Sequence, residues 1–280
     1  MRRPPLQRLA ARIAQTGAPL CVGVDPVPER LPAGLPRNAA GVAEWGIGVV
    51  EAVAPHAAAI KLNLAFYEAL GSEGWRALER VRAAVPDDIV VIADAKRGDI
   101  GTTAERYAVA LLDQVGADAV TLSPFLGEDA VEPFLARGEQ LVYLLARTSN
   151  PSAGRFQSRR LEGGETLTEA VAAWAAERWP GGRVGLVVGA TQPAELATVR
   201  TAAPALGFLV PGIGAQGGDL DAAIAHVHGT SAPGVIGASR SIAEASAGPD
   251  WAEAAAAAAS ELAARMRGAG ATLAGRPRTT

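Results

Sequence analysis

The segment from Asp94 to Asp99 carries charged groups at a spacing suited to acid–base chemistry. The residues before it, 89–93, are apolar and mostly β-branched, which is typical of a buried strand. Because side chains alternate between the two faces of a strand, Asp94 and Lys96 are expected to point in the same direction, with Asp99 following in the next turn. Gathering these charges costs desolvation free energy, on the order of several kcal/mol per ion. The charges therefore either neutralise one another as a structural network or take part in catalysis.

Asp25 and Lys61 end other apolar stretches and extend this set to a chain of alternating charge. A lysine between carboxylates stays protonated, because nearby opposite charges favour its charged form. Lys96 would then be a poor Schiff-base nucleophile and a good proton donor, able to stabilise and protonate a carbanion. A carboxylate beside a substrate's own carboxylate would also disfavour the ground state. These residues alone leave three alternatives open: acid–base or decarboxylase chemistry, a divalent-metal site and a structural ion network.

Two later loops have the composition of a phosphate site. Residues 211–218 are rich in glycine, and residues 237–241 include Arg240. Glycine lets the backbone approach an anion closely, N–H groups at a helix start point toward it, and arginine can bind it through two hydrogen bonds. The first loop also matches G-x-G-x-x-G, but position 237, about twenty residues further on, is glycine where a dinucleotide site has an acidic residue. We therefore expect these loops to bind phosphate rather than a dinucleotide.

Composition excludes several classes of protein. The chain has 280 residues, of which 49% are hydrophobic, so a sizeable core is available. The net charge of −3 argues against nucleic acid or an anionic membrane as a partner. The single cysteine, Cys21, rules out an intramolecular disulfide framework and suits a reducing compartment. No apolar run of about 18 residues is present, so we expect a soluble, cytoplasmic protein.

Short apolar segments alternate with helical patterns along the whole chain. The expected strands are 20–24, 56–62, 89–94, 117–122, 140–146, 184–188, 207–210 and 234–237. The expected helices are 6–16, 41–54, 73–84, one beginning at Thr102, 128–137, 165–178, 193–202, 218–228 and 250–267. Strict alternation predicts a parallel sheet. Eight such units in about 250 residues are the number found in a closed (β/α)8 barrel.

The fold prediction is therefore an α/β protein with one TIM barrel domain over residues 1–280. Helix 6–16 precedes the barrel, and the tail 268–280 is expected to be frayed. A doubly wound open sheet is the alternative fold. In a barrel, active-site residues follow the C-terminal ends of the strands. Polar residues cluster at those positions: Asp25, Lys61, Asp94, Lys96, Asp99, Ser123, Ser149, Gln216 and Arg240.

The run from Asp94 to Thr103, Asp-Ala-Lys-Arg-Gly-Asp-Ile-Gly-Thr-Thr, resembles the signature of the orotidine 5'-phosphate decarboxylase family. Supporting segments occur in the family's order over about residues 20–245. They are Cys21–Pro26, Lys61–Asn63, Ala65–Glu68, Thr148–Pro151, Pro211–Gly218 and Gly237–Ile242. The segments Ala95–Gly98 and Ala65–Glu68 resemble the longer bacterial branch, type 2. The resemblance implies a carboxy-lyase that converts orotidine monophosphate to UMP and CO2 in pyrimidine biosynthesis, without metal or organic cofactor.

The resemblance also implies roles for single residues. Lys96 would donate a proton to C6 of the pyrimidine, flanked by Asp94 and Asp99, and Lys61 would complete the charge chain. In the family, the aspartate corresponding to Asp99 reaches into the partner's site, which implies a homodimer with Thr103 at the same interface. The implied substrate contacts are Asp25 and Lys61 to the ribose, Ser149 to the pyrimidine, Gln216 and Arg240 to the phosphate, and Pro211, Gly237 and Ser239 beside them.

Two other functions are weighed against this one. The metal-dependent 3-keto-gulonate-phosphate decarboxylases and hexulose-phosphate synthases share the Asp-x-Lys-x-x-Asp pattern. They place an acidic metal ligand where this chain has Lys61, whose charge would repel Mg²⁺. A non-catalytic nucleotide-binding barrel is the other alternative, and the intact set of Asp94, Lys96 and Asp99 argues against it. The segment 147–164 is longer than in the shorter branch, and its arginines, Arg155, Arg159 and Arg160, have no implied role.

Overall fold

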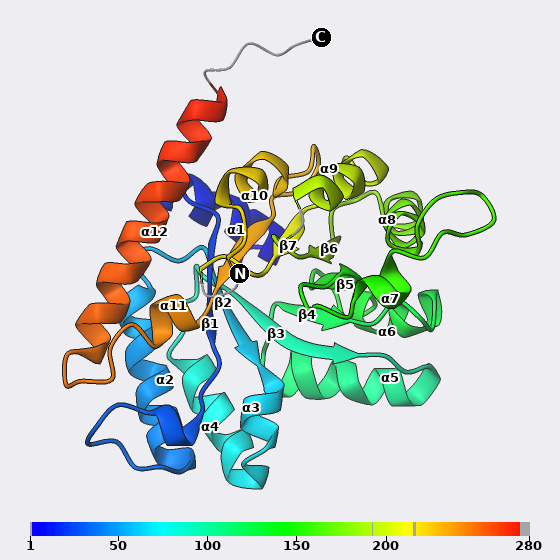
Figure 1. The fold of residues 1–280 in the computed structure, drawn as a ribbon. Helices are drawn as coiled ribbons and strands as arrows, with labels where there is room; N and C mark the ends of the chain where they lie inside the picture. Colours follow the sequence, from blue (N-terminus) through cyan, green and yellow to red (C-terminus); the bar gives the residue numbers. More distant parts are fainter. Residues whose placement is uncertain (1, 192, 215–216, 275–280) are drawn as a thin grey trace.

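Eight parallel strands pair in sequence order and close into a barrel in the computed structural model, which describes residues 2–191, 193–214 and 217–274 (Figure 1). The strands are β1 (Leu20–Val24), β2 (Ala59–Asn63), β3 (Val90–Arg97), β4 (Ala119–Leu122), β5 (Leu141–Arg147), β6 (Val184–Val188), β7 (Phe208–Val210) and β8 (Val235–Ala238). The pairing of β8 with β1 completes the ring. The predicted TIM barrel is confirmed, and the open-sheet alternative is wrong.

Helices surround the barrel. They are α1 (Pro5–Thr16), α2 (Ala39–Val53), α3 (Leu64–Glu68), α4 (Gly71–Ala83), α5 (Gly101–Ala108), α6 (Glu132–Leu135), α7 (Gly154–Gln157), α8 (Leu167–Arg178), α9 (Pro193–Ala202), α10 (Leu220–His226), α11 (Arg240–Ala243) and α12 (Trp251–Ala274). Two 3-10 turns, η1 (Pro28–Arg30) and η3 (Glu128–Ala130), and the π-helical turn η2 (Val109–Gln114) complete the set.

The helix boundaries differ from expectation in three places. The predicted helix 128–137 is split into η3 and α6. The short helices α7 and α11 lie in segments predicted as loops, and α3 lies in a segment for which no element was predicted. Helix α12 continues to Ala274, past the predicted start of the tail at residue 268, because its alanine-rich sequence strongly favours helix. Residues 275–280 of the predicted tail lie outside the described residues.

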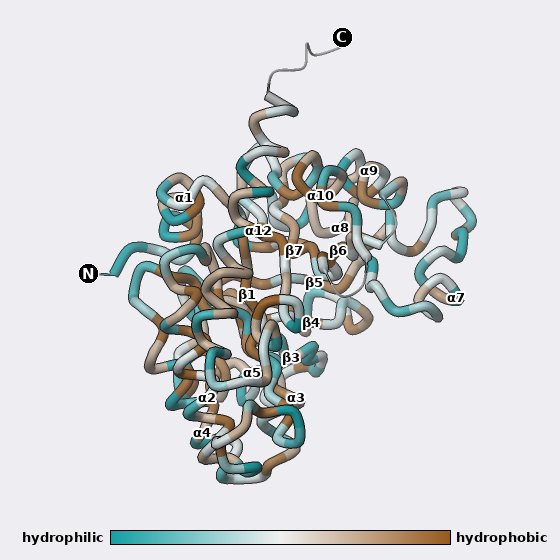
Figure 2. Tube along the Cα trace, turned by 60° about the vertical axis from the view of Figure 1, so that its left-hand side comes forward, coloured by the Kyte–Doolittle hydropathy of each residue, from teal (hydrophilic) through white to brown (hydrophobic). Residues whose placement is uncertain are grey.

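The apolar core has two parts, one on each side of the strands. Outward-facing strand residues such as Val91 pack against the helices. Inward-facing residues, including Cys21, Val90 and Ile92, fill the barrel interior together with Leu9 of α1. Figure 2 shows hydrophobic residues concentrated along the central strands, with hydrophilic residues prominent in the outer loops. The interior of the barrel is therefore filled with apolar side chains. Only the inward positions at the strand ends are free to carry polar groups.

Helix α1 is held to the barrel by two buried arginines. Arg8 forms an ion pair with buried Asp118 and donates a 2.6 Å hydrogen bond to the carbonyl of Asp87. Arg12 donates to the carbonyl of Ala57 at 3.0 Å. Asp118 also accepts from the backbone N–H of Val91 at 2.9 Å, so its carboxylate joins α1 to β3 and to the start of β4. This anchoring keeps β3 in place from the end opposite to its charged residues.

We predict that Arg8→Met destabilises the protein by about 3 kcal/mol, because it leaves the buried carboxylate of Asp118 without its main partner. Unfolding in urea measures this change. Arg3→Met, at an exposed position on the same segment, is the matched control and should change the free energy of unfolding by less than about 0.5 kcal/mol. Equal stability of the Arg8→Met variant and the wild type would contradict the prediction.

Candidate active site

The site is the top layer of the barrel interior. Inward positions along a strand are two residues apart, so the apolar residues Cys21, Ala59 and Ile92 are followed toward the rim by polar ones. On β1, Gly23 comes next and then Asp25 beyond the strand; on the other strands the polar residues are Lys61 on β2, Asp94 and Lys96 on β3, and Thr121 on β4. All but Gly23 line one cavity of about 250 Å³. The barrel's alternation therefore brings together residues that the sequence separates by almost 100 positions.

Asp94 is the centre of the charge cluster. Its Oδ1 accepts from Lys96 Nζ at 2.6 Å, and its Oδ2 accepts from Lys61 Nζ at 3.1 Å. Lys61 Nζ also lies 3.7 Å from Asp25 Oδ1. The order along this wall is thus Asp25, Lys61, Asp94, Lys96, with opposite charges adjacent throughout. The predicted chain of alternating charge is present in this part, and the lysine held between two acids within this chain is Lys61.

The cluster fixes the charge of its buried members. Burial alone would raise the pKa of the Asp94 carboxyl, but the ammonium groups of Lys61 and Lys96 outweigh burial and hold that pKa below its usual range. Burial likewise opposes the charge of Lys61, yet Asp25 and Asp94 outweigh it and raise the pKa of the Lys61 ammonium. Lys61 is buried, whereas the side chain of Lys96 is about half exposed to the cavity, at 48%. Lys96 is therefore the more accessible of the two amines that line the cavity.

The backbone at Lys96 is strained, and Thr121 supports it. The register between β3 and β4 shifts between Ala93 and Arg97, and Lys96 has a φ of 49°, in the left-handed region. Such a conformation in a residue other than glycine persists only where its surroundings enforce it. The hydroxyl of Thr121 accepts from the Lys96 backbone N–H at 2.9 Å and donates to Asp94 Oδ1 at 3.0 Å. One buried hydroxyl on β4 thus orients both charged residues of β3.

Asp99 and Thr103 lie outside this cavity. The carboxylate of Asp99 accepts from the backbone N–H of Ile100 at 2.9 Å, and it forms no ion pair with Lys96 within the described residues. Thr103 is exposed on α5. The expected flanking of Lys96 by Asp99 is therefore absent within a single chain.

The opposite wall of the cavity has the features of an anion site. Pro211, Gly237, Ser239 and Arg240 all line it, as predicted from the loops after β7 and β8. Gly212 and Gly214 have φ values of 106° and 88°, which favour glycine at these positions. Gln216 lies outside the described residues.

Strand β1 passes close beneath the Arg240 wall. A Cβ at Gly23 would lie 1.9 Å from the Ser239 hydroxyl oxygen, so only glycine lets β1 run this near to Ser239. The charge cluster and the Arg240 loop are consequently two walls of one cavity, joined at β1.

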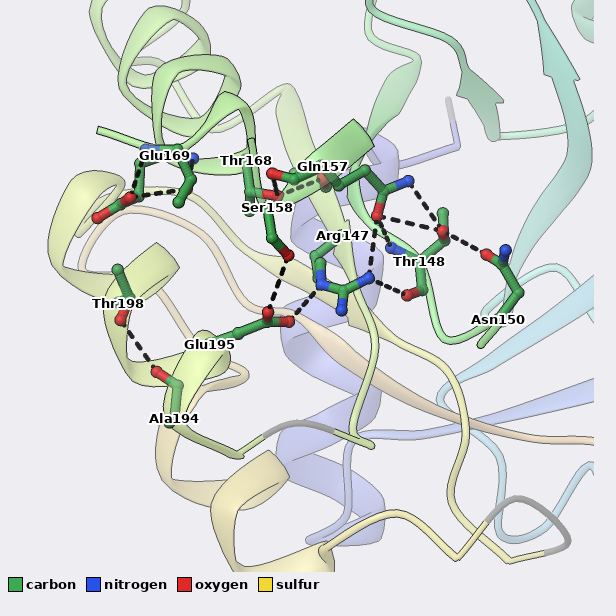
Figure 3. A network of polar contacts seen from close by, with 12 residues as sticks. Arg147, Thr148, Asn150, Gln157, Ser158, Thr168, Glu169, Ala194, Glu195 and Thr198 are labelled. Carbon is green, nitrogen blue, oxygen red and sulfur yellow. Dashed lines mark hydrogen bonds and ion pairs between the residues drawn. The ribbon is translucent and has the colours of Figure 1, made fainter. Parts of the chain in front are cut away.

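Ser149 lines the cavity on its third side, in the segment that follows β5. The residues around it form the polar network of Figure 3. Gln157 on α7 hydrogen-bonds Thr148, and Arg147 pairs with Glu195 on α9. Leu145, Val187 and Leu209 supply an apolar surface next to Ser149. A flat ring can therefore lie between an apolar floor and the charged residues of β3.

Thr121 and Gln157 are among the site residues that the sequence did not reveal. Thr121 lies between Val120 and Leu122 and has the appearance of an ordinary strand residue. Its inward position could have been found from the strand's alternation, since Ala119 and Thr121 share a face. Gln157 lies in a polar segment with no periodicity, and no local signal in the sequence places its side chain.

The described residues offer no group of three or more His, Cys, Asp or Glu side chains that could hold a metal ion. At the end of β2, where the metal-dependent alternative needs an acidic ligand, Lys61 donates to Asp94.

None of the helices in the described ranges combines the length and the apolar character needed to cross a lipid bilayer.

Comparisons with known proteins agree with this geometry. Residues 18–258 match the model of the family described as "Orotidine 5'-phosphate decarboxylase / HUMPS family". The orotidine 5'-phosphate decarboxylase of Herpetosiphon aurantiacus is 45% identical over 89% of this chain and 93% of its own length. That of Thermomicrobium roseum is 46% identical over 90% and 91%. The structure of Leishmania donovani OMP decarboxylase superimposes with a TM-score of 0.83 and 38% identity, covering 95% of this chain and 98% of the other.

The pH dependence of the free energy of unfolding should reveal the charge of Asp94. The pKa of Asp94 is lower in the folded protein than its ordinary value of 3.8. Its ionisation therefore contributes stability that is complete above about pH 5 and is lost as the pH falls below about 4. We predict that Asp94→Asn flattens the loss of unfolding free energy between about pH 5 and pH 3. Urea unfolding at each pH measures the slope.

The control for this experiment is Asp129→Asn, which removes an exposed carboxylate that forms no ion pair with Lys61 or Lys96 in the described residues and should keep the wild-type slope. An Asp94→Asn slope identical to that of the wild type would show that the two ammonium groups do not stabilise the carboxylate.

Proposed function

The chain belongs to the orotidine 5'-phosphate decarboxylase / HUMPS family, and we propose that its cavity converts orotidine 5'-monophosphate to UMP and CO2 with Lys96 as the proton donor. One observation carries the proposal. Lys96 stands beside Asp94 on one wall of a cavity whose other wall presents Arg240, so one nucleotide can span both. The acid–base alternative is thereby preferred to a structural ion network, since a purely structural set has no need of the cavity.

The cavity offers a partner for each part of the nucleotide. Arg240 and the glycine-rich loop after β7 would hold the phosphate, with Gln216 from the same loop. Ser149 would contact the pyrimidine. Asp25 and Lys61 would hold the ribose hydroxyls, and Asp25 Oδ1 supports this role because it is buried and has no hydrogen-bond partner in the described residues. A buried carboxylate oxygen is costly to leave without a hydrogen bond, so a ribose hydroxyl that donates to it would increase the affinity for the nucleotide.

The reaction then needs one proton and no metal or organic cofactor. The bond between C6 and the substrate carboxylate breaks, CO2 leaves, and the electron pair stays on C6. The Lys96 ammonium, aimed by its hydrogen bond to Asp94, stabilises this developing charge and gives its proton to C6. Asp94 would lie beside the substrate carboxylate, which disfavours the ground state, while Lys61 keeps Asp94 ionised. Solvent returns the proton to Lys96 after UMP leaves.

Binding energy from the phosphate contacts would assist decarboxylation, although the phosphate lies far from the reacting carbon. Contacts between the phosphate and the Arg240 wall do not change during decarboxylation, so they can offset the cost of placing the pyrimidine against the charge cluster. The loop after Pro211 would close over the phosphate and exclude water from the reacting carbon.

We also propose that the enzyme is a homodimer in which Asp99 and Thr103 enter the partner's site. Both residues follow β3 and lie outside their own chain's cavity. The same rim exposes large apolar side chains that a partner would cover: Ile100 at 54%, Phe125 at 70% and Leu126 at 48%.

We place the enzyme in the cytoplasm, since its single cysteine is a buried core residue that suits a reducing compartment.

We predict that Lys96→Ala lowers kcat by about 10⁴-fold, because the general acid is lost. UMP binding, measured by calorimetry, should stay within about tenfold of the wild type, because the phosphate and ribose contacts remain. The assay follows the absorbance of orotidine monophosphate in the presence of EDTA, which should leave the wild-type rate unchanged. Near-wild-type turnover by Lys96→Ala would refute the assigned role.

A mixing experiment tests the shared site. Lys96→Ala and Asp99→Ala homodimers should each be strongly impaired. In a mixed dimer, one site combines an intact Lys96 with an intact Asp99 from the other subunit, so random mixing should restore about a quarter of the wild-type activity. Differently tagged subunits allow the mixed dimers to be isolated and verified. Failure of verified mixed dimers to regain activity would contradict the shared arrangement.

A further inference from the structure

The segment after β5 contains the short helix α7, which ends at Gln157, a residue that contacts the cavity wall. The side-chain oxygen of Gln157 accepts from the backbone N–H of Thr148 at 2.9 Å, and its amide nitrogen donates to the Thr148 hydroxyl at 2.9 Å (Figure 3). One amide thus pairs with both the main chain and the side chain of the residue that precedes Ser149.

The hydroxyl of Thr148 extends this hydrogen-bond network to the residue that follows Ser149. It donates to Asn150 Oδ1 at 2.6 Å, and the amide of Asn150 donates to Ser152 at 3.1 Å. Because the Gln157 amide nitrogen is a donor, the Thr148 oxygen accepts from it and its own hydrogen is directed toward Asn150. Ser149 is therefore bracketed on both sides by residues whose hydrogen bonds begin at Gln157.

Gln157 is itself held by the barrel. The hydroxyl of Thr168, at the start of α8, is within hydrogen-bonding distance of the carbonyls of Gln157 and Ala146, at 3.0 and 3.2 Å. Buried Arg147 pairs with Glu195 and donates to Gln157 Oε1 at 3.2 Å. These contacts tie α7 to α8, to α9 and to the end of β5, so Gln157 is a fixed support and not a loosely attached side chain.

The opposite side of Ser149 is closed by β6. Gly189 follows this strand, and a Cβ at Gly189 would lie 3.1 Å from Ser149 Cβ and 3.2 Å from Ser149 N. The backbone N–H of Gly189 donates to the carbonyl of Arg147 at 2.8 Å. Ser149 therefore lies between a glycine that permits close approach and the hydrogen bonds of Gln157, which leaves its position little freedom.

We propose that Gln157 is a positioning residue that holds Ser149 where it can contact the pyrimidine ring. Gln157 thereby makes the site prefer a nucleotide to a sugar phosphate that lacks the base. The proposal rests on the contact of Ser149 with the pyrimidine proposed above. Gln157 touches no part of the substrate and acts only through residues 148–150. It gives the extended segment after β5 a function as the support of the base-recognition loop.

The test compares ligands with and without a base. Gln157→Ala should weaken UMP binding about tenfold, because a misplaced Ser149 loses its contact with the ring. Ribose 5-phosphate, which reaches only the Arg240 wall and the ribose contacts, should inhibit the variant as it inhibits the wild type, within about twofold. Gln157→Glu keeps an acceptor for the Thr148 N–H and loses the donor, so its affinity for UMP should lie between those of Gln157→Ala and the wild type.

Phe156→Ala is the matched control, since Phe156 precedes Gln157 on α7 and is 67% exposed. It should bind both ligands as the wild type does. Unchanged UMP binding by Gln157→Ala would overturn the proposal. Equal weakening of UMP and ribose 5-phosphate would overturn it as well, because general damage to the fold affects both ligands.

A double-mutant cycle separates this proposal from the one on which it rests. If Gln157 acts through Ser149, adding Gln157→Ala to Ser149→Ala should weaken UMP binding by less than about twofold further. Additive effects of the two substitutions would overturn the positioning role. Wild-type UMP binding by Ser149→Ala would instead show that Ser149 does not contact the base, and the proposed substrate contact would fail first.

Discussion

The structure depends on one carboxylate, Asp94, shared between two ammonium groups. Lys61 and Lys96 each donate to a different oxygen of Asp94, and the burial that would otherwise neutralise this group is outweighed by their charge. The chain contains 24 arginines and only two lysines, which are these two. Arginine serves wherever the protein needs a fixed cation, as in Arg8, Arg147 and Arg240. A guanidinium does not give up its proton in proteins, whereas an amine can, so Lys96 carries the group that the proposed proton transfer requires.

The barrel makes this cluster possible because its strands end at one rim. Each charged residue continues an inward-facing row whose lower members form the apolar floor, so the charges lie on a rigid base and face the cavity. The shift in register between β3 and β4 then turns Lys96 toward Asp94, with Thr121 supporting the strained backbone. Distant contacts complete the arrangement. Arg8 fixes β3 and β4 from the opposite end of the barrel, and Arg240 lines the far wall of the cavity, where the proposed function places the phosphate.

Much of this arrangement could be predicted from the sequence. Eight alternating units indicated the barrel, the two-residue spacing put Asp94 and Lys96 on one wall, and the composition of two loops indicated the Arg240 wall. The left-handed backbone at Lys96 could not be predicted, because it arises from a bulge that depends on pairing with β4. The roles of Thr121 and Gln157 come from contacts between segments far apart in the sequence. Alanine-rich α12 runs past the predicted boundary because helix propensity outweighs two glycines there.

The presence of only two lysines makes the central claim directly measurable. Labelling the lysine Nζ atoms with ¹⁵N gives two side-chain signals, and Lys96→Ala assigns them. At neutral pH we predict that both signals are those of ammonium groups hydrogen-bonded to a carboxylate, and that the Lys96 signal shifts when UMP binds. A neutral amine at Lys96, or a Lys96 signal that does not respond to UMP, would contradict the claim that Asp94 holds a proton donor against the pyrimidine.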